Sequence, residues 1–322
     1  MRRFTISPPI AALILAVVLF LLSGLLPNSY GSDVKVALSQ ATNILRLSVF
    51  LGVIAAGQTL VIISGFEGID LSAGSIVTLT AILTYVLVKG QDNMVLPALL
   101  VSMVVGAIIG LLNGSGITFL KISPFVMTLG MSGVVTGAII ILNHGNVSGK
   151  VAPIMTRLIA RPIAPGIPIP NAIIIWIVFG ILMWLLLERT TFGKNLFAIG
   201  VNRVTAKLSG VNVTRMNLST YALAGLLAGF GGFLLVGNTG VVLIQLGQPY
   251  LFPSIAAVAV GGTLLSGGKG SYWGSMAGAI VLTLITSLLT TMQMPDSVRR
   301  MVLGGTLLIL ISIYGRQRAL RQ

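Results

Sequence analysis

Long apolar stretches alternate with short polar breaks along almost the whole chain. Each stretch is close to the length of about 20 residues that a helix needs to cross the hydrocarbon core of a bilayer. We therefore predict an all-α polytopic membrane protein with about ten transmembrane helices in a single domain, residues 1–322. The predicted spans are residues 9–26, 42–64, 70–88, 94–112, 123–143, 171–187, 216–236, 253–265, 273–289 and 298–314.

Composition supports a membrane protein. Hydrophobic residues make up 55% of the chain, charged residues 8%, and the mean hydropathy is +1.02, which leaves too little polar surface to cover a soluble fold. The 39 glycines agree with this, because small residues let membrane helices approach closely. The net charge of +14 does not indicate nucleic-acid binding, because the 20 Lys and Arg residues are scattered singly between apolar spans. We expect membrane lipid, and no nucleic acid, around this chain.

The distribution of Lys and Arg predicts the orientation of the chain. With ten spans both termini lie on one side, and placing them in the cytoplasm puts twelve of the 20 Lys and Arg residues there, as the positive-inside rule requires. Residues 189–215 then face the cytoplasm. Arg2 and Arg3 precede an apolar run, as in a signal peptide, but the run is long and no cleavage pattern is clear. We therefore predict a retained first span.

The connection of residues 144–170 lies on the opposite, periplasmic side in this prediction. Its prolines rule out a continuous helix, because proline lacks the N–H that a helix interior needs. They are Pro153, Pro162, Pro165, Pro168 and Pro170.

Few residues offer catalytic, metal-binding or ion-coupling chemistry. The chain has no cysteine and one histidine, His144, so we expect no metal site and no thiol nucleophile. None of the six acids lies deep within a predicted span, which disfavours an ion-coupled secondary transporter and a membrane enzyme. The nearest approach to a phosphate loop is GGKGS at residues 267–271, but Gly270 replaces the required Ser or Thr. We expect no cofactor in this chain.

Glu67 and Asp70 stand in the segment ISGFEGIDLSAGS, at the start of the third predicted span. One interpretation is a helix N-terminus at which Asp70 or Ser72 accepts hydrogen bonds from backbone N–H groups. The other is a polar break that lines the transport route or pairs with a basic partner. From chemistry alone we favour the helix N-terminus.

Residues 189–215 form the longest polar segment, with the sequence RTTFGKNLFAIGVNRVTAKLSGV at its core. It carries several basic residues and its only neighbouring acid is Glu188. Asn202 and Ser209 are expected to cap short helices on either side of residues 204–208. The segment is either a solvated loop or an amphipathic knob that docks into a partner's groove. Its many apolar residues, which include Val204 and Leu208, favour docking.

Three motifs resemble one known family. They are SGFEGIDLSAGS at residues 64–75, the RTTFGKNLFAIGVNRVTAKLSGV segment, and GGTLLSGGKGSYWGS at residues 261–275. The chain resembles the permease subunits of bacterial ABC importers for ribose, xylose, arabinose, galactose and related sugars, a branch that includes autoinducer-2 permeases. The order of spans is similar over nearly the whole chain. This sequence departs from the family at Ala73, where valine is frequent, and at Phe66-Glu67, which adds an acid.

The resemblance implies a function and partners. It implies the pathway subunit of an ATP-driven sugar importer in the bacterial inner membrane, which is not itself an enzyme. Its partners would be an ABC ATP-binding subunit that carries the ATP, a periplasmic sugar-binding protein, and a second permease chain, identical or paralogous. The matching positions implied to couple to the ATPase are Gly193, Ala198, Gly200, Asn202, Ala206, Ser209 and Gly210. The matching positions near the pathway or the helix start are Gly68, Asp70, Ser72, Gly74 and Ser75.

A shorter likeness exists within the chain. The segment GIDLSAGS at residues 68–75 resembles LLSGGKGS at residues 264–271, and each leads into a span on the same predicted side. Transporters often contain internal repeats, but short segments rich in Gly and Ser also match by chance. The sequence leaves both explanations open.

Overall fold

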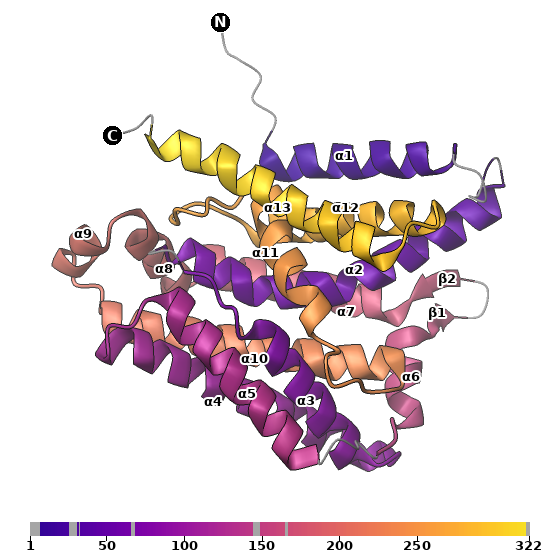
Figure 1. Cartoon of the computed structure of the whole chain (residues 1–322), viewed down its shortest axis with the longest axis horizontal. Helices are drawn as coiled ribbons and strands as arrows, with labels where there is room; N and C mark the ends of the chain where they lie inside the picture. The colour runs from indigo at the N-terminus through magenta and orange to yellow at the C-terminus, as the bar shows by residue number, and fades with distance from the viewer. Residues whose placement is uncertain are drawn as a thin grey trace, which may run out of the picture.

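The computed structural model describes residues 7–25, 31, 33–65, 68–143, 149–164 and 167–319. Over these residues the protein is a helical bundle with one small hairpin (Figure 1). The elements are α1 (Pro8–Ser23), α2 (Val34–Ile63), α3 (Ala73–Val88), η1 (Asp92–Met94), α4 (Val95–Phe119), α5 (Pro124–Asn143), α6 (Pro153–Ala160), β1 (Pro162–Ala164), β2 (Ile167–Pro170), α7 (Asn171–Trp184), η2 (Leu185–Arg189), α8 (Thr191–Val201), α9 (Arg203–Leu208), α10 (Val213–Thr239), η3 (Gln248–Tyr250), α11 (Leu251–Val260), α12 (Tyr272–Thr291) and α13 (Asp296–Ala319).

A helix lies at each of the ten predicted spans. Within the described residues, six helical segments are long and apolar enough to cross a membrane. Three apolar helices are shorter than a full span: Pro8–Ser23, Ala73–Val88 and Gln248–Val260. The multi-pass character predicted from the sequence is therefore confirmed. The six segments are Val34–Ile63, Asp92–Phe119, Pro124–Ile141, Asn171–Arg189, Val213–Thr239 and Tyr272–Thr291.

Some predicted boundaries are wrong for local reasons. The second span begins at Val34 instead of residue 42, because the Asp33 carboxylate accepts hydrogen bonds from the N–H groups of Lys35 and Val36 and starts the helix early. The third begins at Ala73 instead of residue 70, because Asp70 belongs to a buried turn. The eighth ends at Val260 instead of residue 265, where the backbone turns through Gly262 at a φ of +86°.

The core lies around α2 and α10. The most apolar windows of these two helices are 89% and 78% buried, whereas that of α5 is 22% buried and faces outward. Glycines allow α10 to lie directly against α4: a Cβ at Gly225 would strike the Gly106 carbonyl, and one at Gly110 would strike the Tyr221 carbonyl. The close approach predicted from the glycine content is thus present, and it rests on backbone contact.

The connection of residues 144–170 is partly regular. Its first five residues, 144–148, which include His144, lie outside the described residues. Pro153 occupies the start of the short helix α6, and β1 pairs antiparallel with β2, with Pro162 opposite Pro170. The prediction of no continuous helix is confirmed, and the hairpin is an addition to the expected all-α fold. Figure 1 places it at the opposite end of the bundle from α8 and α9.

Candidate functional site

The polar segment of residues 189–215 folds into two short helices at one end of the bundle (Figure 1). The Thr190 hydroxyl accepts a hydrogen bond from the Gly193 N–H at 3.2 Å and starts α8. Helix α8 ends before Asn202, whose backbone is extended (φ −157°). The side-chain oxygen of Asn202 accepts hydrogen bonds from the N–H groups of Val204 and Thr205, each at 3.0 Å, and so caps α9. The predicted Asn202 cap is confirmed.

The predicted Ser209 cap is wrong. Ser209 ends α9, and its N–H donates to the Thr205 carbonyl at 2.9 Å. The next helix, α10, is capped by Asn212, whose side chain accepts from the Arg215 N–H at 2.9 Å. Gly210 between them has a φ of +87°, a conformation that suits glycine, and it has open space around it.

Three of the family-matched positions in this segment face the protein interior. Gly193 packs on the Leu187 carbonyl, and Ala206 is only 4% exposed. Gly200 packs on the Ile63 carbonyl at the end of α2. Ala198 is half-buried, whereas Asn202, Ser209 and Gly210 are exposed. The matched positions are thus divided between the inner side of the segment and its outer surface.

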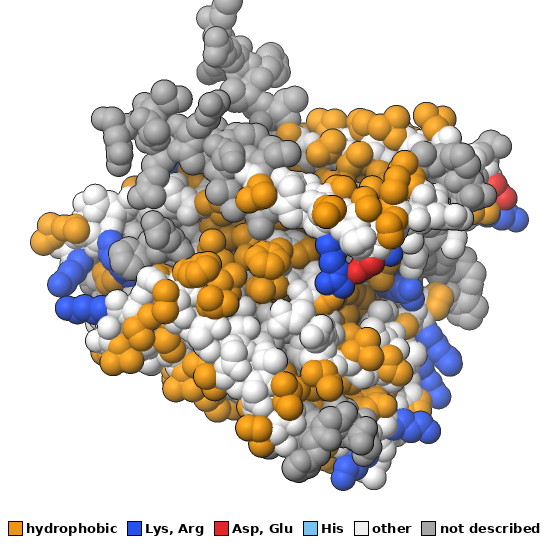
Figure 2. Space-filling model, in the orientation of Figure 1, with side chains coloured by type: hydrophobic (Ala, Val, Ile, Leu, Met, Phe, Trp, Pro, Cys, Tyr) orange, Lys and Arg blue, Asp and Glu red, His pale blue; other side chains and the backbone are white. Residues whose placement is uncertain are grey.

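The outer surface of this segment is apolar at its end. Val201, Val204 and Leu208 are 72%, 68% and 84% exposed, and we call these three residues the apolar tip. Lys207 beside them is also exposed. Figure 2 shows hydrophobic side chains next to Lys and Arg side chains at this end of the molecule. The sequence indicated an amphipathic knob, but the family match alone did not select these three side chains.

Four glycines from three parts of the chain meet beneath α8. They are Gly65 after α2, Gly200 in α8, and Gly267 and Gly268 in the loop that follows α11; we call them the glycine junction. The Gly268 N–H donates to the Ile63 carbonyl at 2.9 Å. A Cβ at Gly65 would lie 3.2 Å from the Gly200 Cα, and a Cβ at Gly200 would lie 2.9 Å from the Gly268 Cα. All three sequence motifs therefore meet at one backbone contact.

A buried polar turn precedes α3. One carboxylate oxygen of Asp70 accepts from the Ser72 N–H at 2.9 Å and from the Ser72 hydroxyl at 2.6 Å. The Asn113 amide donates to the same hydroxyl at 2.8 Å, and the Gln58 amide donates to the Asp70 carbonyl at 2.6 Å. Asp70 is 1% exposed and Ser72 is fully buried. Asp70 accepts a backbone N–H bond, as the helix N-terminus interpretation expects, but the bond comes from the turn before α3, and the N-cap residue Ser72 makes no side-chain capping bond.

The other matched positions near α3 have packing contacts. A Cβ at Gly68 would lie 2.9 Å from the Gly65 carbonyl, and one at Gly74 would lie 3.2 Å from the Gly247 carbonyl. The Ser75 hydroxyl donates to the Ser72 carbonyl at 2.8 Å. Glu67 lies outside the described residues. Over the described part of the chain, no three Asp, Glu or His residues cluster as metal ligands would.

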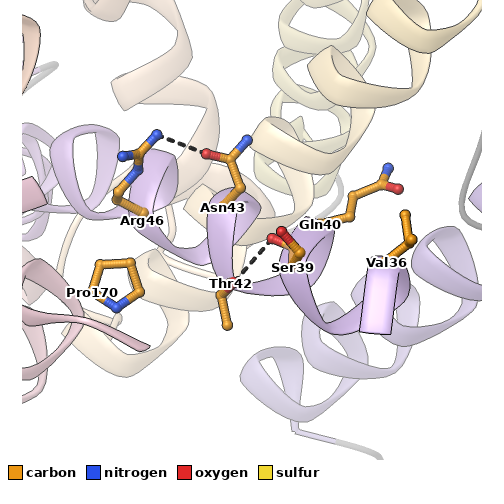
Figure 3. Close-up of a pocket in the computed structure, with 7 residues that line it drawn as sticks. All are labelled: Val36, Ser39, Gln40, Thr42, Asn43, Arg46 and Pro170. Atoms are coloured by element: carbon orange, nitrogen blue, oxygen red, sulfur yellow. Dashed lines mark hydrogen bonds between the residues drawn. The ribbon is translucent and has the colours of Figure 1, made fainter. Parts of the chain in front are cut away.

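An open surface pocket of about 430 Å³ lies along the first turns of α2, at the opposite end of the bundle from α8 and α9 (Figure 1 and Figure 3). Arg46 donates to the Asn43 side-chain oxygen at 2.8 Å within it. Its wall contains hydroxyl, amide and guanidinium groups, and it contains no acid. The lining residues are Val36, Ser39, Gln40, Thr42, Asn43, Arg46 and Pro170.

The fold and these sites define a class of protein. The described residues form a multi-pass helical bundle with a structured basic segment outside the spans. The family model described as "Branched-chain amino acid transport system / permease component" matches residues 40–311. The chain belongs to this permease family.

Curated relatives cover nearly all of the chain. The ribose import permease protein of Bacillus subtilis is 34% identical over 279 residues, which is 86% of this chain and 84% of the relative. The galactose/methyl galactoside import permease protein of Salmonella typhimurium is 33% identical over 292 residues, 86% of each chain. The autoinducer 2 import system permease protein of Yersinia enterocolitica is 32% identical over 329 residues, covering 100% of this chain and 94% of the relative.

Proposed function

We propose that this chain is the membrane pathway subunit of an ATP-driven ABC importer for a sugar or a related small polyhydroxylated solute. The observation that carries the proposal is the apolar tip, a set of exposed apolar side chains on a basic segment outside the spans. Single exposed apolar side chains are ordinary in proteins, but Val201 at the end of α8 and Val204 and Leu208 on α9 lie together outside the membrane-spanning helices, which supports a partner. The names of the relatives support sugar import.

In the proposed assembly, each end of the bundle binds a different partner. An ABC ATP-binding subunit docks on α8 and α9, carries the ATP, and receives the apolar tip in a groove. A periplasmic sugar-binding protein docks at the other end, near the hairpin and the pocket at Arg46. A second permease chain completes the pathway. This arrangement requires ten spans, cytoplasmic termini and insertion in the bacterial inner membrane, and it places no ATP or other cofactor on this chain.

The proposed coupling role is divided within residues 189–215. The apolar tip contacts the ATPase, Asn202 and Ala206 hold α9 in shape, and Gly193 and Gly200 seat α8 on the bundle. The remaining coupling positions are Ala198 in α8 and Ser209 and Gly210 after α9. Replacing Ala206 with Leu should therefore displace α9 and uncouple ATP hydrolysis from uptake while the protein remains inserted. Full ATP-driven uptake by Ala206→Leu in vesicles would contradict this division.

Substrate class is testable because the family description and the relatives' names differ. The family description names branched-chain amino acids, whereas the relatives are named for ribose, galactose and autoinducer 2. Proteoliposomes with the permease, its ATPase and its binding protein should accumulate labelled ribose or galactose and not leucine. Accumulation of leucine alone would overturn the sugar assignment but leave the permease assignment standing. Co-purification identifies the ATPase and binding protein needed for this assay.

A further inference from the structure

The glycine junction is a contact between backbones with no side chain between them. Gly65, Gly267 and Gly268 adopt φ values of +75°, +88° and +74°, which other residues rarely reach. Gly200 is helical, but an added Cβ would strike the Ile63 carbonyl. The hydrogen bond from Gly268 to Ile63 joins the loop of residues 261–271 to the end of α2 at the same point, so close backbone contact there adds to the side-chain packing of α8 through Leu196 and Ile199.

From the junction, the chain leads into two loops, one before α3 and one between α11 and α12. On one side, the Gly65 carbonyl accepts from the Gly68 N–H at 3.0 Å, and the chain leads into the buried turn of Asp70 before α3. On the other side, the Leu264 N–H donates to the Lys269 carbonyl at 3.0 Å and closes the loop between α11 and α12. At the base of that loop, a Cβ at Gly261 would lie 2.6 Å from the Ser275 nitrogen at the start of α12.

The covalent link from α9 to α10 is a second connection out of this segment. It passes through Gly210, which has a positive φ and nothing within 4 Å of its Cβ position, although the Gly210 and Val211 N–H groups donate to the Lys207 and Ala206 carbonyls. The glycine junction differs from this link because it joins α8 to the ends of α2 and α11 by close contact between backbones distant in sequence, and a closely packed contact moves as a unit.

We infer that the glycine junction is the element that transmits movement of the ATPase-docked segment to the short apolar helices α3 and α11. This inference rests on the proposed function, and it adds the route that the movement takes. Gly65, Gly200, Gly267 and Gly268 are positioning residues that touch neither the ATPase nor the solute. The apolar tip receives the partner, and the junction converts that contact into movement of the pathway helices.

The test separates docking from transmission. Gly65→Ala places a methyl group 3.2 Å from the Gly200 Cα, and Gly267→Ala places one against the Gly65 Cα. Neither residue lies in the docking segment, so both variants should leave ATPase co-purification and ATP hydrolysis unchanged while lowering solute imported per ATP about tenfold, within the usual range of coupling energies. Gly133→Ala is the matched control, because its Cβ meets nothing within 4 Å, and it should behave as wild type. Unchanged import per ATP in both junction variants would overturn the inference.

A distance measurement in the otherwise native protein tests the inference even if the glycine variants do not fold. The chain has no cysteine, so cysteines introduced at the exposed Lys194 and Lys269 carry spin labels on either side of the junction. In the otherwise native complex, their separation should stay constant between the nucleotide-free and ATP-bound states. A change in that separation would show that α8 moves independently of the loop and would overturn the inference. Loss of ATPase binding by the wild-type chain would instead refute the proposed function.

Discussion

The inner and outer faces of residues 189–215 differ in chemistry and in task. The inner face combines close glycine contacts with buried apolar side chains: Gly200 rests on the Ile63 carbonyl, Gly193 rests on the Leu187 carbonyl, and Leu196 is fully buried. The outer face ends in large apolar side chains, with Leu208 84% exposed. Gly193, Gly200 and Ala206 match the family and lie on the inner face, whereas the exposed apolar side chains of the tip are not among the matched positions. In the proposed function, the motif therefore marks the coupling segment without naming the residues that contact the ATPase.

The largest expected effect comes from filling the inner face. Gly200→Val adds a branched side chain where even a Cβ strikes the Ile63 carbonyl, and overpacking of this kind costs about 1–3 kcal/mol or more. We expect a lower thermal unfolding temperature in detergent and complete loss of uptake. Native stability together with normal uptake would show that the inner face is not closely packed.

The next largest effect comes from charging the outer face. Leu208→Asp should leave the fold intact but weaken ATPase binding by at least about 2 kcal/mol, or about thirtyfold in Kd, as expected for a central apolar anchor. The measurement is ATPase affinity by biolayer interferometry with the permease in nanodiscs. Leu120→Asp is the matched control, because Leu120 is 70% exposed in the turn between α4 and α5. Equal losses in the two variants would contradict a specific role for the apolar tip.

A smaller effect is expected at Asn202, the cap between α8 and α9. Asn202→Ala removes the cap of α9 and should cost about 1 kcal/mol of helix stability, so the tip is presented less often. ATPase affinity should fall about fivefold by the same assay. Asn202→Asp keeps an acceptor oxygen and should retain most of the affinity. A similar loss in both variants would indicate that the amide contacts the ATPase directly.

The smallest effect is expected from the exposed charge beside the tip. Lys207→Ala should change ATPase affinity by less than about 1 kcal/mol, because exposed charges at an interface rim contribute little. Its effect should lie mainly in the association rate and should shrink as salt is raised. A loss equal to that of Leu208→Asp would place the binding energy in charge instead of the apolar tip.

Sequence reasoning succeeded where the signal was periodic or compositional. Each apolar window coincides with a helix, six helical segments among the described residues are long and apolar enough to span a membrane, and Asn202 was correctly predicted as a cap because its short polar side chain precedes a helical run. Sequence reasoning failed for features that depend on contacts between residues far apart in the chain. Nothing local in the chain shows that Gly65 meets Gly200 and Gly267, because these residues are far apart in the sequence. The early start of α2 was also missed, because the Asp33 cap outweighs the polar character of the next turns.

The candidate site was predictable in extent but not in detail. The basic, acid-poor composition located residues 189–215, and the alternation of Val204 and Leu208 with polar residues indicated a knob. Burial of Ala206 and exposure of Val201 depend on how α9 turns at Asn202, and this turn is a property of the folded chain. The likeness between residues 68–75 and 264–271 remains a prediction, although the glycine junction joins the two loops to which they belong.

The most direct test of the account is uptake by proteoliposomes that contain the permease, its ATPase and its binding protein. We predict accumulation of labelled ribose or galactose that requires ATP on the side of α8 and α9, and that persists when a protonophore removes the proton gradient at fixed ATP. Accumulation driven by an imposed ion gradient without ATP, and abolished by the protonophore, would contradict the account.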